Sequence, residues 1–215
     1  TATQQLLLAE GRTRDLIRRM NTLLTASIAA NGRLQLSLAR RGVSLRGLVR
    51  DASAQVQSVS GRHTVRAVLS KGSLRVPGDR DLLRQLLDNL LENAVKYSPD
   101  GGRITVRVTT ESANELVAAR IEVEDQGIGI PAQDIPFVFE RYRRGTGRVE
   151  RIRGTGLGLY TCRAIVAAHG GRIWVERSAV ATEGTSGTAA TPGSSDDWHG
   201  TVMAVVLPAA GSAAA

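Results

Sequence analysis

From about Val43 onward, the chain switches repeatedly between helix-like and strand-like spacing of its apolar residues, and this switching limits the folds open to it. Several segments have an alternating or short apolar pattern without the strict strand–helix alternation of a parallel sheet. The pattern therefore favours an α+β domain. We expect helices over 45–59, 79–97 and 155–169, and strands over 62–69, 73–76, 103–110, 116–124, 173–176 and 202–207.

Ahead of that domain, residues 4–40 have the three- and four-residue apolar spacing of an amphipathic helix. The pair Asn31-Gly32 can end this helix. One amphipathic helix buries little surface by itself, so it requires a partner helix. That partner could come from a second subunit, from a segment outside this chain, or from both.

The net charge of +8 does not indicate nucleic-acid binding. Only Lys71 and Lys96 are lysines, and the arginines are spread over the whole chain. Single-strand binders combine basic grooves with stacking aromatic residues, and this chain has few aromatic residues. We expect no nucleic-acid partner.

The cysteine content and the lengths of the apolar runs further limit the class of protein. A lone Cys162 excludes a disulfide framework, and three scattered histidines make a structural zinc site improbable. No apolar run reaches the length of about 18 residues that spans a bilayer, and no signal peptide is visible. These features are typical of a soluble domain in a reducing, cytoplasmic compartment.

Three segments are expected to lack regular structure. Residues 131–153 combine Pro, Gly and charge with little periodicity, which predicts a long mobile loop. Residues 178–200 are rich in Ser, Thr, Gly and Ala, which predicts a flexible insertion or an extended hairpin loop. The tail 209–215 is of low complexity and is expected to fray.

The predicted helix at 79–97 aligns three polar side chains. At about 100° per residue, Asn89, Asn93 and Lys96 lie within roughly 40° of one another. An amide oxygen suits a hard metal ion, and an ammonium group suits phosphate oxygens, so the trio fits a magnesium–phosphate group. The alternative for this helix alone is a solvated polar face.

Asp125 stands at the end of a predicted strand and is followed by Gly127 and Gly129. Glycines let a backbone approach a ligand closely, and a carboxylate can accept a hydrogen bond from an exocyclic amine such as that of adenine. The alternative is a simple Asx turn that ends the strand.

Gly154, Gly156 and Gly158 precede the helix predicted at 155–169. Such a turn exposes backbone N–H groups and a helix N-terminus to anionic oxygens. It is not a P-loop, because no Gly-Lys-Ser/Thr ends it, and it lacks the βαβ context of a dinucleotide site.

Taken in order, four motifs resemble the N, G1, F and G2 boxes of the bacterial sensor histidine kinase ATP-binding domain. They are Asn89-x-x-x-Asn93-Ala94-x-Lys96-Tyr97, Asp125-x-Gly127-x-Gly129, Phe137-x-Phe139-Glu140-Arg141-Tyr142 and Gly154-x-Gly156-x-Gly158. The resemblance covers about residues 43–208. It implies a two-layer α/β sandwich of the Bergerat type, with a mixed sheet and a Gly-rich lid over ATP. Residues 1–42 resemble the second helix of the family's dimerisation hairpin.

The resemblance also implies roles for single residues. Asn93 would hold Mg²⁺, Asp125 would accept from the adenine amine, and Thr201 would support Asp125. Asn89, Lys96 and Arg144 would be the catalytic residues, with Lys96 and Arg144 at the phosphates. The remaining roles fall to Tyr97 beside the base or ribose, to Gly127 and Gly129 in the adenine turn, to Gly154, Gly156, Leu157 and Gly158 over the phosphates, and to Phe137, Phe139, Arg141 and Tyr142 in the lid, where the two Phe would anchor the loop.

Asn89 favours phosphoryl transfer over hydrolysis. Gyrase-like and chaperone ATPases carry a Glu there, and an amide cannot act as that general base. The acceptor histidine of the family is followed by Glu or Asp, and His63, His169 and His199 do not fit. The chain is therefore expected to be a C-terminal fragment of a kinase. By itself, this fragment is expected to be inactive in autophosphorylation.

The resemblance implies further partners and leaves two alternatives open. The full-length protein would be a homodimer and would pass the phosphoryl group to a response-regulator receiver domain. Upstream segments could anchor it to a membrane. The alternatives are an anti-sigma type of Ser/Thr protein kinase and a nucleotide-binding module without turnover.

Overall fold

The computed structural model describes residues 2–32, 34–36, 42–70, 72, 74–113, 116–143, 152, 154–180 and 198–209. From Val43 onward these residues form one mixed sheet with helices on one of its faces, so the predicted α+β class is confirmed.

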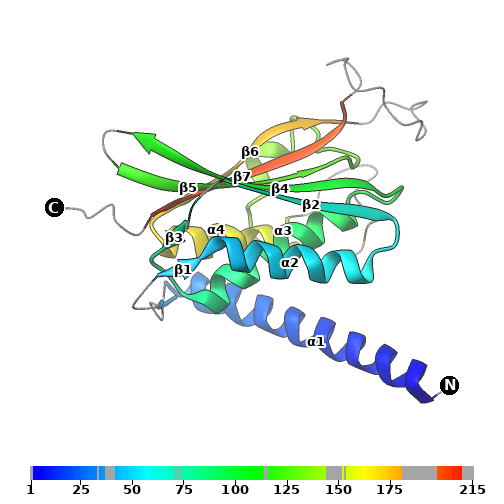
Figure 1. Ribbon diagram of the computed structural model, residues 1–215. Coiled ribbons are helices and arrows are strands. Elements are labelled where there is room, and N and C mark those ends of the chain that lie inside the picture. Colours follow the sequence, from blue (N-terminus) through cyan, green and yellow to red (C-terminus); the bar gives the residue numbers. More distant parts are fainter. Residues whose placement is uncertain are drawn as a thin grey trace.

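The main sheet has five strands in the order β2-β4-β5-β7-β6 (Figure 1). Its β2 and β4 are parallel, and the other neighbouring strands are antiparallel. A separate two-stranded sheet pairs β1 (Val43–Ser44) with β3 (Arg75–Val76). The strands of the main sheet are β2 (His63–Leu69), β4 (Gly102–Ala113), β5 (Leu116–Asp125), β6 (Arg172–Ala179) and β7 (Gly200–Pro208).

Three helices cover one face of this sheet: α2 (Leu45–Val59), α3 (Arg80–Lys96) and α4 (Gly158–Ala168). The core lies between the two layers, because alternate strand residues point inward and meet the apolar sides of the helices. Fully buried members include Ile104 and Ile121 from the strands, Leu86 and Leu91 from α3, and Ile165 from α4.

The boundaries of α3 follow from its sequence. The Asp79 carboxylate accepts hydrogen bonds from the backbone N–H groups of Asp81 and Leu82, so it caps the helix as expected. The N–H of Asp79 in turn donates to Nε2 of His169, at the end of α4, over 3.0 Å. This bond ties the start of α3 to the end of α4.

The leading helix α1 (Ala2–Ala30) ends just before Asn31-Gly32. Residues 34–36 are not helical, so a helix continuing to residue 40 was wrong; Gly32 has a φ of +65°, a conformation that ends helices readily. Residues 37–41 lie outside the described residues. Within the described part of the chain, no helix is both long and apolar enough to cross a bilayer.

One side of α1 contacts α3 and α4, and the other side is apolar and exposed. Thr22 and Thr25 are buried against the domain, and the Thr25 hydroxyl donates to Oε1 of Gln85 over 3.0 Å. The exposed apolar residues, all at least half accessible, are Leu16, Ile17, Met20, Leu23 and Leu24. The structure therefore leaves an apolar stripe of α1 uncovered, as the sequence predicted.

The structure revises the described parts of three predicted irregular segments, of which residues 144–151, 153 and 210–215 lie outside the described residues. Ser178 and Ala179 belong to β6 and Gly200 to β7, so both strands extend into the predicted insertion; residues 181–197 lie outside the described residues. Ala209 is buried, and its N–H donates to the Val117 carbonyl. The loop predicted at 131–153 contains a short 3₁₀ helix, η1 (Ile135–Phe137).

Candidate nucleotide site

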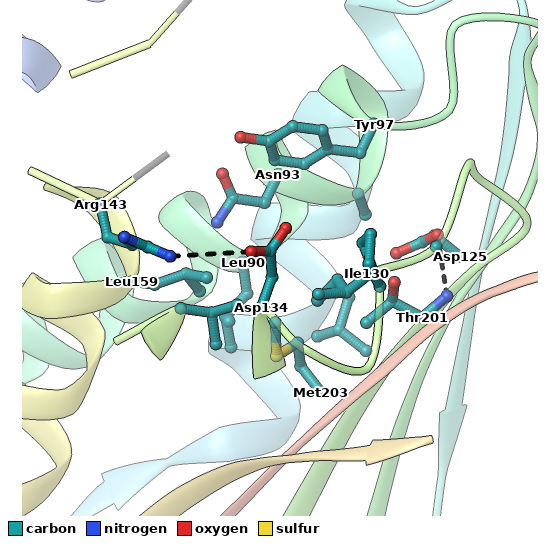
Figure 2. Close-up of a pocket in the computed structure, with 15 residues that line it drawn as sticks. Leu90, Asn93, Tyr97, Asp125, Ile130, Asp134, Arg143, Leu159, Thr201 and Met203 are labelled. Carbon is teal, nitrogen blue, oxygen red and sulfur yellow. Dashed lines mark hydrogen bonds and ion pairs between the residues drawn. The ribbon is translucent and has the colours of Figure 1, made fainter. Parts of the chain in front are cut away.

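A pocket lies between α3, the ends of β5 and β7, and the segment 129–143 (Figure 2). Its walls are mainly apolar, and a few polar side chains enter from different elements, which is the usual composition of a small-molecule site. The lining residues are Leu90, Asn93, Ala94, Tyr97, Val123, Asp125, Gly129, Ile130, Pro131, Asp134, Val138, Arg143, Leu159, Thr201 and Met203.

Asp125 is a buried acid of this pocket, with only 6% of its surface exposed. Its Oδ1 accepts from the N–H of Gly127 over 2.9 Å and from the N–H of Thr201 over 3.2 Å. Both bonds go to one oxygen, so Oδ2 remains an acceptor for a ligand. Burial raises the pKa of this carboxyl to about 6, although the two N–H donors oppose the rise.

The turn after Asp125 is held from two sides. On the α3 side, the Tyr97 carbonyl accepts from the N–H of Ile128 over 2.9 Å. On the other side, the N–H of Ile130 donates to the Ser178 hydroxyl over 2.7 Å. A methyl group at Gly127 would collide with the Tyr97 carbonyl, and one at Gly129 with the Ala179 carbonyl, so the close packing requires both glycines.

Asn93, Lys96 and Tyr97 lie at the C-terminal end of α3. Asn93 and Tyr97 line the pocket, and Lys96 contacts Tyr97. The Lys96 ammonium lies 4.6 Å from the centre of the Tyr97 ring and donates to its hydroxyl over 3.1 Å. The same ammonium is so close to Gly154 that a methyl group there would collide with it. The structure thus brings Lys96 and the glycine-rich turn together.

The glycine-rich turn leads directly into α4. Gly156 has a φ of +69°, and its carbonyl accepts from the N–H of Tyr142 over 3.0 Å. Leu157 is buried, and α4 begins at Gly158 rather than at the predicted residue 155. The delay arises because Gly154–Leu157 are used for this turn. The N-terminus of α4 follows at once, so its free N–H groups are available near the pocket.

Asn89 is not among the residues that line the pocket, but its amide and that of Asn93 both approach Gly158 at the start of α4. The Asn89 Nδ2 donates to the Gly158 carbonyl over 3.4 Å, and its Oδ1 accepts from the Thr22 hydroxyl over 3.5 Å. With 5% of its surface exposed, Asn89 lies where α1, α3 and α4 meet. The hydrogen bonds to Thr22 and Gly158 orient the Asn89 amide.

The expected lid residues have different environments. Phe139 packs against the core, but Phe137 is 41% exposed beneath the Arg143 guanidinium, so the expectation that both anchor the loop holds for Phe139 alone. The Arg141 guanidinium lies over the exposed Tyr142 ring, and Tyr142 has a φ of +62°. Arg144 lies outside the described residues.

Sequence reasoning missed two polar residues of the pocket. Asp134 is buried, and its carboxylate lies 3.8 Å from the Arg143 guanidinium, as the dashed line at the left of Figure 2 marks. The only available signal was charge inside the predicted loop. Among the described residues, no cluster of three or more His, Cys, Asp or Glu could hold a metal ion.

Comparisons with known proteins agree with this geometry. Residues 78–210, more than half of the chain, match the family model described as histidine kinase-, DNA gyrase B- and HSP90-like ATPase. Sensor histidine kinase WalK of Bacillus subtilis is 42% identical over 129 residues, which is 58% of this chain and 20% of WalK. Adaptive-response sensory kinase SasA of Crocosphaera subtropica is 32% identical over 82% of this chain and 47% of SasA.

Solved structures show the same fold. The mycobacterial sensor histidine kinase MprB superposes with a TM-score of 0.59 at 29% identity, covering 78% of this chain and 95% of MprB. Full-length ShkA, solved with AMPPNP, gives a TM-score of 0.67 at 21% identity over the whole of this chain and 40% of ShkA. The chain spans a fifth of WalK and about half of SasA. The chain thus belongs to the histidine kinase-, DNA gyrase B- and HSP90-like ATPase family and carries the ATP-binding catalytic domain of a sensor histidine kinase.

Proposed function

We propose that this domain binds ATP with Mg²⁺ and transfers the γ-phosphoryl group to a histidine on a helix outside this chain. A response-regulator receiver domain would then take the group from that histidine. The observation that carries the proposal is the buried Asp125, whose Oδ1 is fixed by two backbone N–H groups while Oδ2 remains for a ligand.

At the Asp125 end, Oδ2 would accept from the exocyclic amine of adenine. The apolar walls, which include Leu90, Ile130 and Met203, would bury the faces of the base. Tyr97 would flank the base or the ribose. An adenine ring is recognised here by one acceptor in an apolar slot, an arrangement that disfavours bases without that amine.

At the opposite end, Asn93 would hold Mg²⁺ together with phosphate oxygens and water. This fits the chain, because Mg²⁺ in nucleotide sites keeps several waters and takes few protein ligands. Bound Mg²⁺ would neutralise phosphate charge. Lys96 would contact the phosphates beside Gly154, and the N–H groups at the start of α4 would face them. Arg144 would add a second cation.

Transfer is favoured over hydrolysis by the residue at position 89. Asn89 carries an amide, which cannot take a proton, and it bonds to Thr22 and Gly158. Among the acids of α3, Glu92 forms an ion pair with Arg18 of α1 over 3.7 Å, and Asp88, next to Asn89, pairs with Arg84 over 2.9 Å. Asn89 would then act by holding Gly158, at the start of α4, in place.

The histidines of the chain support an acceptor elsewhere. The His63 Nε2 bonds to the Ser98 carbonyl, and both ring nitrogens of His169 bond to backbone groups. His199 bonds to the Gly127 carbonyl. All three are therefore engaged within the domain. We infer that this chain alone does not phosphorylate itself, and that the apolar stripe of α1 pairs with a second helix in a cytoplasmic homodimer.

The direct test mixes the chain with a separately produced acceptor helix pair and γ-labelled ATP. The proposal predicts label on the acceptor histidine that depends on Mg²⁺ and disappears with Asp125→Asn. Label on a Ser or Thr would favour the anti-sigma type of kinase. Tight ATP binding with no transfer to any acceptor would favour a nucleotide-binding module instead.

A further inference from the structure

The segment around the β6–β7 junction reaches back to the turn that carries Asp125. Three bonds connect them: Thr201 N–H to Asp125 Oδ1, Ile130 N–H to the Ser178 hydroxyl, and His199 to the Gly127 carbonyl. Two of these bonds need a side chain from this segment. The composition of 178–200 predicted an insertion, so the bonds of Ser178 and His199 were not visible in the sequence, whereas support of Asp125 by Thr201 was expected.

The His199 bond has a defined direction. Its Nδ1 lies 2.9 Å from the Gly127 carbonyl oxygen, and that oxygen can only accept, so Nδ1 carries the proton. His199 is half-buried, and its neighbour Trp198 lies beneath the Arg177 guanidinium at 3.7 Å from the ring centre. The ring is therefore presented from a backbone that β6 supports.

The peptide groups of Gly127 connect His199 to Asp125. The N–H of Gly127 donates to Asp125 Oδ1, while its carbonyl accepts from His199. Gly127 has no side chain that could restrict its backbone, so these outside bonds set its orientation. A shift of Gly127 would move the N–H donor and turn the Asp125 carboxylate with it.

We propose that His199 is a positioning residue that sets the preference of this site for adenine over other purines. Through Gly127 it holds the Asp125 carboxylate so that Oδ2 faces the exocyclic amine of the base. The proposal rests on the proposed function, because it requires that Asp125 reads adenine. It adds a residue from the β6–β7 segment to the determinants of specificity.

The test compares the affinities of ATP and inosine triphosphate (ITP), which carries a carbonyl oxygen where adenine has its amine. His199→Ala should lower the ATP/ITP affinity ratio about 10-fold and leave ITP binding nearly unchanged. His199→Asn places an amide N–H near the position of Nδ1 and should restore most of the ratio. His199→Gln places it near Nε2 and should behave like the alanine variant.

His169→Ala is the matched control, since it removes a buried histidine that bonds to backbone groups far from Asp125. It should lower the melting temperature and leave the ATP/ITP ratio unchanged. The proposal is overturned if His199→Ala weakens ATP and ITP equally, or if the Asn and Gln variants give the same ratio.

The ATP/ITP affinity ratios of the wild type and of Asp125→Asn distinguish a failure of this proposal from a failure of the proposed function. If wild type does not prefer ATP, or if Asp125→Asn keeps the preference, then Asp125 does not read adenine and both proposals fail. If Asp125→Asn abolishes the preference while His199→Ala keeps it, the proposed function stands and the role of His199 is refuted.

Discussion

At the Asp125 end of the pocket, the turn at 125–130 is bonded to α3 on one side and to the β6–β7 segment on the other. At the Lys96 end, the turn at 154–158 meets the flexible Lys96 side chain and bonds to Tyr142. At the Asp125 end, both glycines of the turn pack against backbone, so this end is held before any ligand arrives. At the Lys96 end, Gly156 also packs against the backbone of Tyr142 and Arg143, but Gly154 meets the Lys96 side chain, which can move to suit a ligand.

Among the glycine variants, Gly127→Ala is expected to have the largest effect. The new methyl group would collide with the Tyr97 backbone, which cannot move without disturbing the end of α3. We expect ATP affinity to fall by about 100-fold or more, together with a lower melting temperature. Calorimetric titration and thermal unfolding measure the two effects. Near-normal affinity would show that this end is not rigid.

Asn93→Ala should affect only the metal-dependent part of binding. Without the amide oxygen, Mg²⁺ loses its proposed protein ligand, but Asp125 and the apolar walls remain. We expect the gain in ATP affinity on adding Mg²⁺ to shrink by about 10-fold, with little change in EDTA. Equal loss with and without Mg²⁺ would place Asn93 at the nucleotide itself.

Asp125→Asn should stabilise the fold at neutral pH. Because burial raises the pKa of Asp125 to about 6, above its ordinary value near 4, the folded state holds this proton more tightly than the unfolded state. Stability from this group is complete below pH of about 4 and is lost as pH rises through 6. The amide has no such loss, so the variant should gain up to about 3 kcal/mol above pH 6.

Chemical denaturation at a series of pH values checks this sign. The advantage of Asp125→Asn over wild type should be small near pH 4, grow up to about pH 6.5, and stay constant above it. An advantage that shrinks with rising pH would mean that the carboxylate is stabilised by its N–H donors more than burial penalises it.

Gly154→Ala should have the smallest effect. The methyl group would meet Lys96 Nζ, which is the far end of a flexible side chain and can move aside. We expect ATP affinity within about 3-fold of wild type and a stability change below about 0.5 kcal/mol. A loss as large as that of Gly127→Ala would erase the contrast between the two ends of the pocket.

Local sequence signals were enough for much of the fold. Asp79 marked the start of α3 because its carboxylate caps the helix locally, and the alternating pattern identified β4 and β5. The start of α4 was missed because Gly156 bonds to Tyr142, a residue that the periodicity does not place beside it. An apolar pattern indicates local propensity, and it does not indicate a hydrogen-bond partner that another element supplies.

The same limit applies to the candidate site. Asp125, Thr201 and Gly127 could be named from motifs, and the structure brings all three together. The hydrogen bonds of the Asn89 amide could not be predicted, because its partners Thr22 and Gly158 lie on other helices. His199 lies beside a low-complexity segment whose composition hides its contact with Gly127.

The most direct test of the central claim is calorimetric titration of ATP, with and without Mg²⁺, into the wild-type chain and into Asp125→Asn. We expect the wild type to bind ATP with a Kd between micromolar and millimolar, about −8 to −4 kcal/mol, and a folded Asp125→Asn variant to show no measurable ATP binding. Equal ATP binding by both proteins would contradict the assignment of Asp125 as the residue that reads adenine.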